Sequence, residues 1–255
     1  MPLRSLLVLA LLSAAFLVPP MAQAAAPAAA DTSVFPYPGD GARSTHGASL
    51  RLVPQGRVKK PGVDEYDYKL VARGFPRGRV YRLWYARLGS PAELLCGALV
   101  ADSTGSLVPS DSAATFERSV CPPLDQLELG ASEYLPGEPY RVGVLSTDDS
   151  VRTIATAFPH PIEGRDGRYW LLLEMNSADR RAFTLWGVGF APNENLHTRI
   201  TSGGESHEGP AFADEHGVLR IALTAPTEQA GGMATYEVIG AGGRPKVTYR
   251  WGADP

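Results

Sequence analysis

From Leu50 onward, apolar and polar residues alternate with a period of two over many short segments. Such alternation places successive side chains on opposite faces of an extended chain, which predicts half-buried β-strands. Between Tyr66 and Arg73, for example, tyrosine, leucine and alanine fall on one predicted face and most of the charged residues on the other. Long helical periodicity is lacking, and only residues 111–118 have the composition of a short helix. The pattern predicts an all-β protein.

The strand signals recur in the same order in both halves of the chain. In the first half they cover residues 50–53, 66–73, 80–88, 94–100, 140–145 and 151–157, and in the second half residues 169–175, 182–188, 196–201, 218–224, 234–239 and 246–251. Two units of about seven short strands each are typical of β-sandwiches of immunoglobulin-like kind. We therefore expect two tandem immunoglobulin-like β-sandwiches, over residues 49–162 and 168–253.

Two short phrases occur once in each half. The first is a glycine and a phenylalanine shortly before a proline, and the second is an aspartate followed three positions later by a glycine. Their residues are Gly74, Phe75, Asp102 and Gly105 in the first half, and Gly189, Phe190, Asp214 and Gly217 in the second. Glycine permits a positive φ, proline ends ladder pairing, and aspartate bonds the backbone ahead of it in a turn. Both phrases are predicted to be structural turns.

At these residues the chain resembles the immunoglobulin-like repeat modules of many bacterial exported and cell-surface proteins. In those modules a Gly-x-Gly-Phe-x-Pro-x-Glu phrase precedes a strand, an Ala-Asp-x-x-Gly turn follows, and a final hairpin closes the unit. The second half matches through Gly187, Gly189, Phe190, Pro192, Glu194, Asp214 and Gly217. The first half lacks the first glycine and the glutamate, and it carries an insertion at residues 109–136. The resemblance covers most of residues 49–253 and implies a fold and an exported location; such modules serve as spacers, adhesion units or binding domains.

The N-terminal residues 1–24 have the three parts of a secretory signal peptide. Arg4 supplies the basic region, residues 6–18 are apolar, and Ala22-Gln23-Ala24 is a small-residue cleavage site. The apolar run is shorter than the roughly 20 residues that a membrane-spanning helix needs, so no membrane span is expected. Residues 25–48 are rich in alanine, proline and glycine and are predicted to be a flexible linker, in which Phe35 and Tyr37 are tethers against the next domain. The protein is expected to be secreted or periplasmic.

The formal net charge of −3 is mild, and no cluster of lysine and arginine occurs. Nucleic acid and anionic membrane surfaces are therefore not expected as partners. Cys96 and Cys121 are the only cysteines, and in an exported protein an even count predicts one disulfide, here between a strand and the insertion. On the loop-entropy account it would stabilise the fold by roughly 3 kcal/mol. Two free thiols are the alternative, and the paired spacing of a cysteine metal site is missing.

His197, His207 and His216 lie within twenty residues that also hold several carboxylates. Imidazole and carboxylate groups can bind zinc or another transition metal, so these histidines are the weak candidates for a metal or hydrolytic site. None of the recognised metal-binding spacings is present, and Ser206 fails the Gly-x-Ser-x-Gly pattern of a nucleophile. Residues 205–209 are expected to be a solvated loop. We therefore predict no catalytic residue and no cofactor.

The four tryptophans, Trp84, Trp170, Trp186 and Trp251, all fall in predicted strands. Large aromatic residues in a sandwich usually fill its core, although Trp186 and Trp251 facing outward together would make a polysaccharide-stacking platform. The insertion at residues 109–136 is the better candidate for a partner surface, since a bare sandwich does not need it, or it covers its own sheet edge. The sequence predicts a non-enzymatic binding or structural module whose partner is an envelope or extracellular protein, bound by the insertion and the junction loops at residues 158–168.

Overall fold

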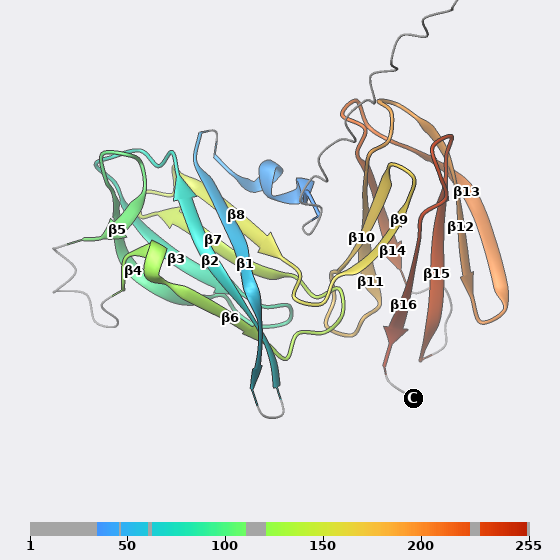
Figure 1. Ribbon diagram of the computed structural model, residues 1–255, viewed down its shortest axis with the longest axis horizontal. Helices are drawn as coiled ribbons and strands as arrows, with labels where there is room; N and C mark the ends of the chain where they lie inside the picture. The colour runs from blue at the N-terminus through green and yellow to red at the C-terminus, as the bar shows by residue number, and fades with distance from the viewer. Residues whose placement is uncertain (1–34, 46, 61–62, 111–120, 225–229, 254–255) are drawn as a thin grey trace, which may run out of the picture. The chain divides into compact units, whose positions relative to one another are not determined.

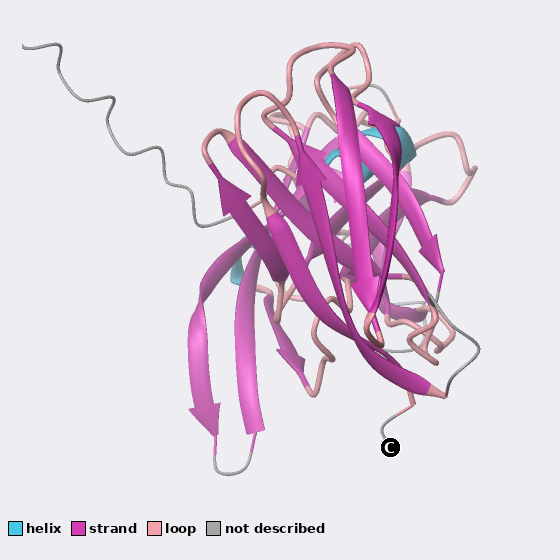
Figure 2. Cartoon of the chain, turned by 90° about the vertical axis from the view of Figure 1, so that its right-hand side faces the viewer, coloured by secondary structure: helices cyan, strands magenta, loops and turns pink. Residues whose placement is uncertain are grey.

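The computed structural model describes residues 35–45, 47–60, 63–110, 121–224 and 230–253. Nearly all of this part of the chain is strand or connecting loop (Figures 1 and 2). The predicted signal peptide and the short helix expected at residues 111–118 lie outside the described residues. Within the described residues, no helix is long and apolar enough to cross a membrane.

The first half folds into two facing antiparallel sheets (Figure 1). A three-stranded sheet has the order β1-β2-β6, with β1 at Ser49–Lys60, β2 at Val63–Arg73 and β6 at Glu128–Ser132. A five-stranded sheet has the order β5-β4-β3-β7-β8, with β3 at Val80–Ala86, β4 at Glu93–Ala101, β5 at Leu107–Pro109, β7 at Tyr140–Ser146 and β8 at Arg152–Ala157. One continuous core of buried apolar residues lies between them.

The second half repeats this plan with two four-stranded antiparallel sheets. One has the order β14-β11-β10-β9, with β9 at Ile162–Asp166, β10 at Tyr169–Met175, β11 at Ala182–Val188 and β14 at Leu219–Thr224. The other has the order β13-β12-β15-β16, with β12 at Asn195–Ser202, β13 at Glu205–Phe212, β15 at Gly231–Ile239 and β16 at Lys246–Gly252. The predicted fold class, two tandem immunoglobulin-like β-sandwiches, is confirmed.

The cores follow the alternation in the sequence. In β7, Tyr140, Val142 and Val144 are buried, while the residues between them are only half-buried. In β16, Val247, Tyr249 and Trp251 are buried and alternate with exposed residues. The period of two therefore predicts correctly which side chains enter each core.

Four strands were not predicted: β5, β6, β9 and β13. The first half of β13 is exposed on both faces, so its sequence lacks the alternation that marks a half-buried strand. Its backbone nevertheless pairs with β12 along its whole length, from Ser202 opposite Glu205 to Asn195 opposite Phe212. The expectation of a solvated loop at residues 205–209 was therefore wrong. Strand β9 pairs with β10, so the second sandwich begins at Ile162 and not at residue 168.

The insertion is partly built into the first sandwich. Strand β6 pairs with β2, and the short 3-10 helix η3 at Leu124–Gln126 precedes it. Leu124, Leu129 and Ala131 are buried in the core of the first sandwich. The disulfide between Cys96 and Cys121 is present, and it joins β4 to the start of this segment. The described part of the insertion thus extends and covers its own sheet, the alternative that the sequence left open.

The segment before the first sandwich packs more closely than its composition predicts. A 3-10 helix, η1, spans Pro38–Arg43 and lies beside β8 (Figure 1). The Asp40 carboxylate accepts hydrogen bonds from the backbone N–H and the hydroxyl of Thr156, at 2.8 and 2.6 Å. Phe35 packs edge-on against Trp170 of the second sandwich, with ring centroids 5.0 Å apart. From Phe35 on, the segment is therefore attached to both sandwiches, and we call residues 35–43 the strap.

The two turn phrases of each half meet in space. The Phe75 N–H donates to the Gly105 carbonyl at 3.1 Å in the first sandwich, and Asn193 N–H donates to the Asp214 carbonyl at 2.9 Å in the second. Asp214 Oδ1 accepts from the backbone N–H groups of His216 and Val218, and these bonds, with Val218 first, lower the pKa of Asp214. The phrases thus close one end of each sandwich, as structural turns do.

Candidate functional site

The three candidate histidines are not brought together. His197 Nε2 lies 2.9 Å from Glu208 Oε2, across the β12–β13 pair. His207 Nε2 lies 3.8 Å from Glu205 Oε2 at the end of the same hairpin. His216 Nε2 lies 3.6 Å from Glu215 Oε1 in a turn. Among the described residues, no group of three or more His, Cys, Asp or Glu side chains could hold a metal ion. The histidines form three separate exposed pairs.

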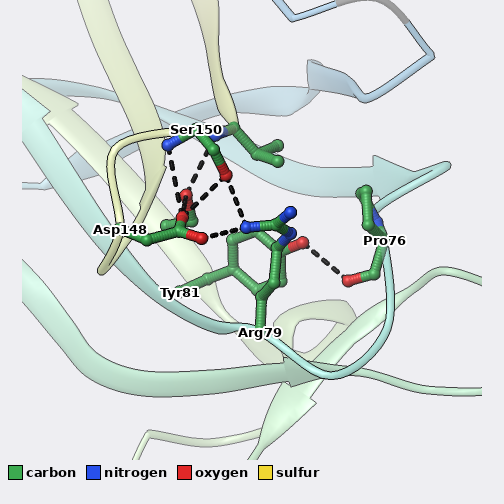
Figure 3. Close-up of polar contacts among 7 residues, drawn as sticks. Pro76, Arg79, Tyr81, Asp148 and Ser150 are labelled. Carbon is green, nitrogen blue, oxygen red and sulfur yellow. Dashed lines mark hydrogen bonds and ion pairs between the residues drawn. The ribbon is translucent and has the colours of Figure 1, made fainter.

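Asp148 holds a turn between β7 and β8 (Figure 3). Its carboxylate accepts hydrogen bonds from the hydroxyls of Ser146 and Ser150, at 2.6 and 2.7 Å, and forms an ion pair with Arg79. The hydrogen bonds, with that of Ser146 first, lower the pKa of Asp148. The Asp148 carboxylate therefore stabilises the turn of the β7–β8 hairpin.

Trp186 and Trp251 do not form an outer platform. The side chain of Trp251 has no exposed surface and lies in the core of the second sandwich. Trp186 is also buried, in a separate apolar cluster with Phe35 and Leu172, where the strap covers the sheet of β10 and β11. The hypothesis of a polysaccharide platform on these two tryptophans was therefore wrong, because one fills a core and the strap covers the other.

Glu174 is a buried carboxylate at the contact of the strap with both sandwiches. Only 2% of the residue is exposed, and it lies in strand β10, where all the other residues are apolar or aromatic. Its Oε2 accepts hydrogen bonds from the Tyr37 hydroxyl at 2.7 Å and the Trp186 indole N–H at 2.6 Å. Its Oε1 forms an ion pair with Arg141 of β7. We call Tyr37, Arg141, Glu174 and Trp186 the junction cluster.

The junction cluster joins three segments through one charge. Tyr37 belongs to the strap, Arg141 to the first sandwich, and Glu174 and Trp186 to the second. The Tyr37 ring packs edge-on against Trp186 and Phe158, with centroids 5.2 and 5.4 Å away. A buried charge is tolerated only when it is paired and hydrogen-bonded, as here. Losing any of the three donors would leave the carboxylate less well compensated.

The first sandwich also has an open cleft of about 330 Å³ between β6 and the ends of β3 and β7. We call it the tyrosine cleft, because three tyrosines contribute to its wall. Its polar and aromatic lining residues are Tyr85, Arg87, Glu128, Ser132, Tyr134 and Tyr140. The volume is at the lower end of the range for small-molecule sites.

The tyrosine rings of the cleft are fixed by one another and by Arg87. Tyr134 packs edge-on against Tyr140, with centroids 5.5 Å apart, and the Arg87 guanidinium lies 4.7 Å from the centre of the Tyr134 ring. Arg87 Nε donates to the buried Glu138 carboxylate at 2.9 Å, and its Nη2 donates to the Glu133 carbonyl. Hydrogen bonding to Glu138 raises the pKa of Arg87. The wall is therefore rigid, and its positive charge is already neutralised.

Sequence reasoning missed the junction cluster and the tyrosine cleft. The one signal for the first is a glutamate inside the otherwise apolar run Tyr169-Trp170-Leu171-Leu172-Leu173-Glu174-Met175. An ionisable residue at a position that alternation and apolarity place in a core needs a buried partner. The cleft had no signal of its own, because its tyrosines come from separate strands and from the insertion.

Comparisons with known proteins add little to this description. No protein-family model matches the chain, and no curated protein matches it either. Among solved structures, one that is described as a tetra-tandem repeat in the extending region of a large adhesion protein aligns with 81% of this chain at 8% identity, with a TM-score of 0.27. The aligned part spans 49%, about half, of that protein's chain.

Proposed function

We propose that this chain is an exported, non-enzymatic binding module of the cell envelope or the extracellular space, with a protein as its partner. The observation that carries the proposal is the junction cluster. A buried charge shared by the strap and both sandwiches resists their separation, because breaking a buried ion pair is strongly unfavourable. Two sandwiches held in this way can present their surfaces to a partner as one unit.

The use of the polar residues supports a non-enzymatic role. Glu194, from the phrase of the second sandwich, accepts hydrogen bonds from the Tyr169 hydroxyl and from the backbone N–H of Ala191. Asp148 caps a hairpin, and His197 pairs with Glu208 across two strands. These residues hold turns and strands, so they are not poised to act on a substrate.

The partner surface that we propose is the insertion at residues 109–136, together with the junction segment at residues 158–168, which includes strand β9. In the described part of the insertion, Leu135 and Glu128 are exposed beside the buried residues that anchor it. The disulfide fixes the start of this segment to β4.

The test is capture of partners by the mature chain, residues 25–255, from envelope and secretome extracts of its own host, followed by mass spectrometry. We expect one saturable protein partner, whose binding is lost when residues 112–119 are deleted with both cysteines kept. A matched control is the double variant His207→Ala/His216→Ala, which alters exposed residues elsewhere and should bind the partner as the wild type does.

The competing enzyme hypothesis predicts different results. Zinc would raise the melting temperature of the wild type, and the His207→Ala/His216→Ala variant would lose that response. If no protein is captured in a saturable way, the proposal of a protein partner is contradicted. If a partner binds the deletion variant as well as the wild type, the proposed surface is contradicted.

A further inference from the structure

Two tyrosines of the tyrosine cleft are buried, and their hydroxyl groups make no hydrogen bond to the residues that the structure describes. Tyr134 and Tyr140 line it and are only 8% and 3% exposed. Among the described residues, neither hydroxyl has a hydrogen-bond partner, and neither oxygen is among the fully enclosed, unpartnered atoms. The rings that carry both hydroxyls line the cleft. Burial raises the pKa of both groups, so they are neutral donors and acceptors at ordinary pH.

The charges around the cleft select against an anionic ligand. Arg87 is neutralised by the buried Glu138 and is directed to the Glu133 carbonyl, so it does not offer a free charge to an anion. Its guanidinium also lies over the Tyr134 ring, where a cationic ligand would otherwise stack. Glu128 at the rim carries an acceptor-only carboxylate, which suits hydroxyl donors.

The walls combine flat rings with polar groups at their edges. Leu95 and Leu129 complete the apolar part of the lining, and Ser132 adds a hydroxyl at the rim. A sugar ring presents C–H groups on its faces and hydroxyls around its edge, which matches this arrangement. A concave site with a few convergent polar groups beside apolar and aromatic side chains is a usual form of a ligand pocket.

We propose that the tyrosine cleft is a binding site for a neutral mono- or disaccharide. The sugar ring packs on the tyrosine and leucine side chains, and its hydroxyls bond the hydroxyls of Tyr134 and Tyr140 and the Glu128 carboxylate. This binding is non-covalent. The cleft shares Glu128 with the partner surface proposed above, but sugar binding and protein capture are measured separately, so either proposal can fail while the other stands.

The test is a titration of the mature chain with a panel of neutral sugars, followed by NMR and calorimetry. The panel holds glucose, galactose, mannose, N-acetylglucosamine, maltose and cellobiose. We expect saturable binding of at least one of them with a dissociation constant below about 10 mM. The largest chemical-shift changes should fall on residues of the tyrosine cleft.

The double variant Tyr134→Phe/Tyr140→Phe removes the two hydroxyls and keeps both rings, so the fold should persist, as near-UV circular dichroism would show. Its affinity for the bound sugar should fall about tenfold, since hydrogen bonds to the ligand are lost. The matched control is Tyr249→Phe, which removes a buried, unpartnered hydroxyl from the second sandwich and should leave the affinity unchanged.

Three results would overturn the proposal. The first is that no sugar of the panel binds at concentrations of about 10 mM. The second is that a sugar binds equally well to the double variant, which would place its site elsewhere. The third is that N-acetylneuraminate, an anionic sugar titrated beside the panel, binds while none of the neutral sugars does, which would contradict the charge argument.

Discussion

At the scale of single residues, the buried carboxylate of Glu174 contacts donors from the strap and from both sandwiches. Its carboxylate has donors from three segments that are far apart in the sequence, with separations of 137, 33 and 12 positions. Because the group is buried, each donor matters: a charge in a low-dielectric interior is stabilised only by its partners.

Replacing Glu174 by alanine should therefore destabilise the fold strongly. The change leaves Arg141 without its counter-charge and Trp186 without its acceptor. Removing one member of a buried pair typically costs about 3–5 kcal/mol, and we expect a loss of at least about 2 kcal/mol in the free energy of unfolding. Urea unfolding followed by tryptophan fluorescence measures it.

The matched control is Glu215→Ala. The side chain of Glu215 is highly exposed, and its Oε1 lies 3.6 Å from His216 Nε2. Loss of this carboxylate should therefore change the free energy of unfolding by less than about 0.5 kcal/mol. Equal, small effects of both variants would show that the Glu174 interactions do not contribute to stability.

At the scale of elements, the turn phrases determine how each sandwich is closed. Gly189 and Gly217 both have positive φ, 89° and 71°. A Cβ at Gly189 would overlap the carbonyl oxygen of Arg168, and one at Gly217 would overlap that of Phe190. The glycines of these phrases are required both for backbone conformation and for close approach of neighbouring segments.

Gly189→Ala should consequently cost more than a glycine replacement at another turn. Gly203, in the β12–β13 turn, also has positive φ, but a Cβ there would have no neighbour within 4 Å. We expect Gly203→Ala to cost about 1 kcal/mol, from backbone strain alone, and Gly189→Ala to cost more than about 2 kcal/mol. Thermal or urea unfolding of both variants decides this, and equal losses would contradict the proposed close contact.

The sequence predicts most of the elements because alternation is a local property. Strands such as β7 and β16 carry their core residues at every second position. Strand β13 could not be found in this way, since backbone pairing with β12 holds it and burial does not. The same holds for the candidate sites: the turn aspartates were predictable from their spacing, whereas the junction cluster and the cleft depend on which distant segments meet.

At the scale of the whole molecule, buried tyrosines give the protein a predictable sensitivity to alkali. Burial raises the pKa of Tyr68, Tyr134, Tyr140, Tyr236 and Tyr249, in the last case to about 12. These groups lie in both sandwiches. As the pH rises, these tyrosines therefore ionise in the unfolded chain, near the ordinary pKa of 10, before they ionise in the folded chain.

The sign of the effect follows from linkage. A group whose pKa is higher in the folded state contributes stability that is fully present below the unfolded pKa and is lost as pH rises toward the folded pKa. We expect the contribution of these tyrosines to the free energy of unfolding to be constant at neutral pH and to fall steadily between about pH 10 and pH 12. Urea unfolding at a series of pH values, with tyrosinate absorbance as a second signal, measures this, and a level profile through pH 12 would contradict it.

The proposal that the two sandwiches and the strap act as one binding module is tested most directly by calorimetric unfolding of residues 25–255. We predict a single transition whose calorimetric enthalpy equals its van't Hoff enthalpy, because the junction cluster couples the two sandwiches. In the Glu174→Ala variant that transition should divide into two. Two separate transitions in the wild type, unchanged by Glu174→Ala, would show that the sandwiches are independent and would contradict the proposal.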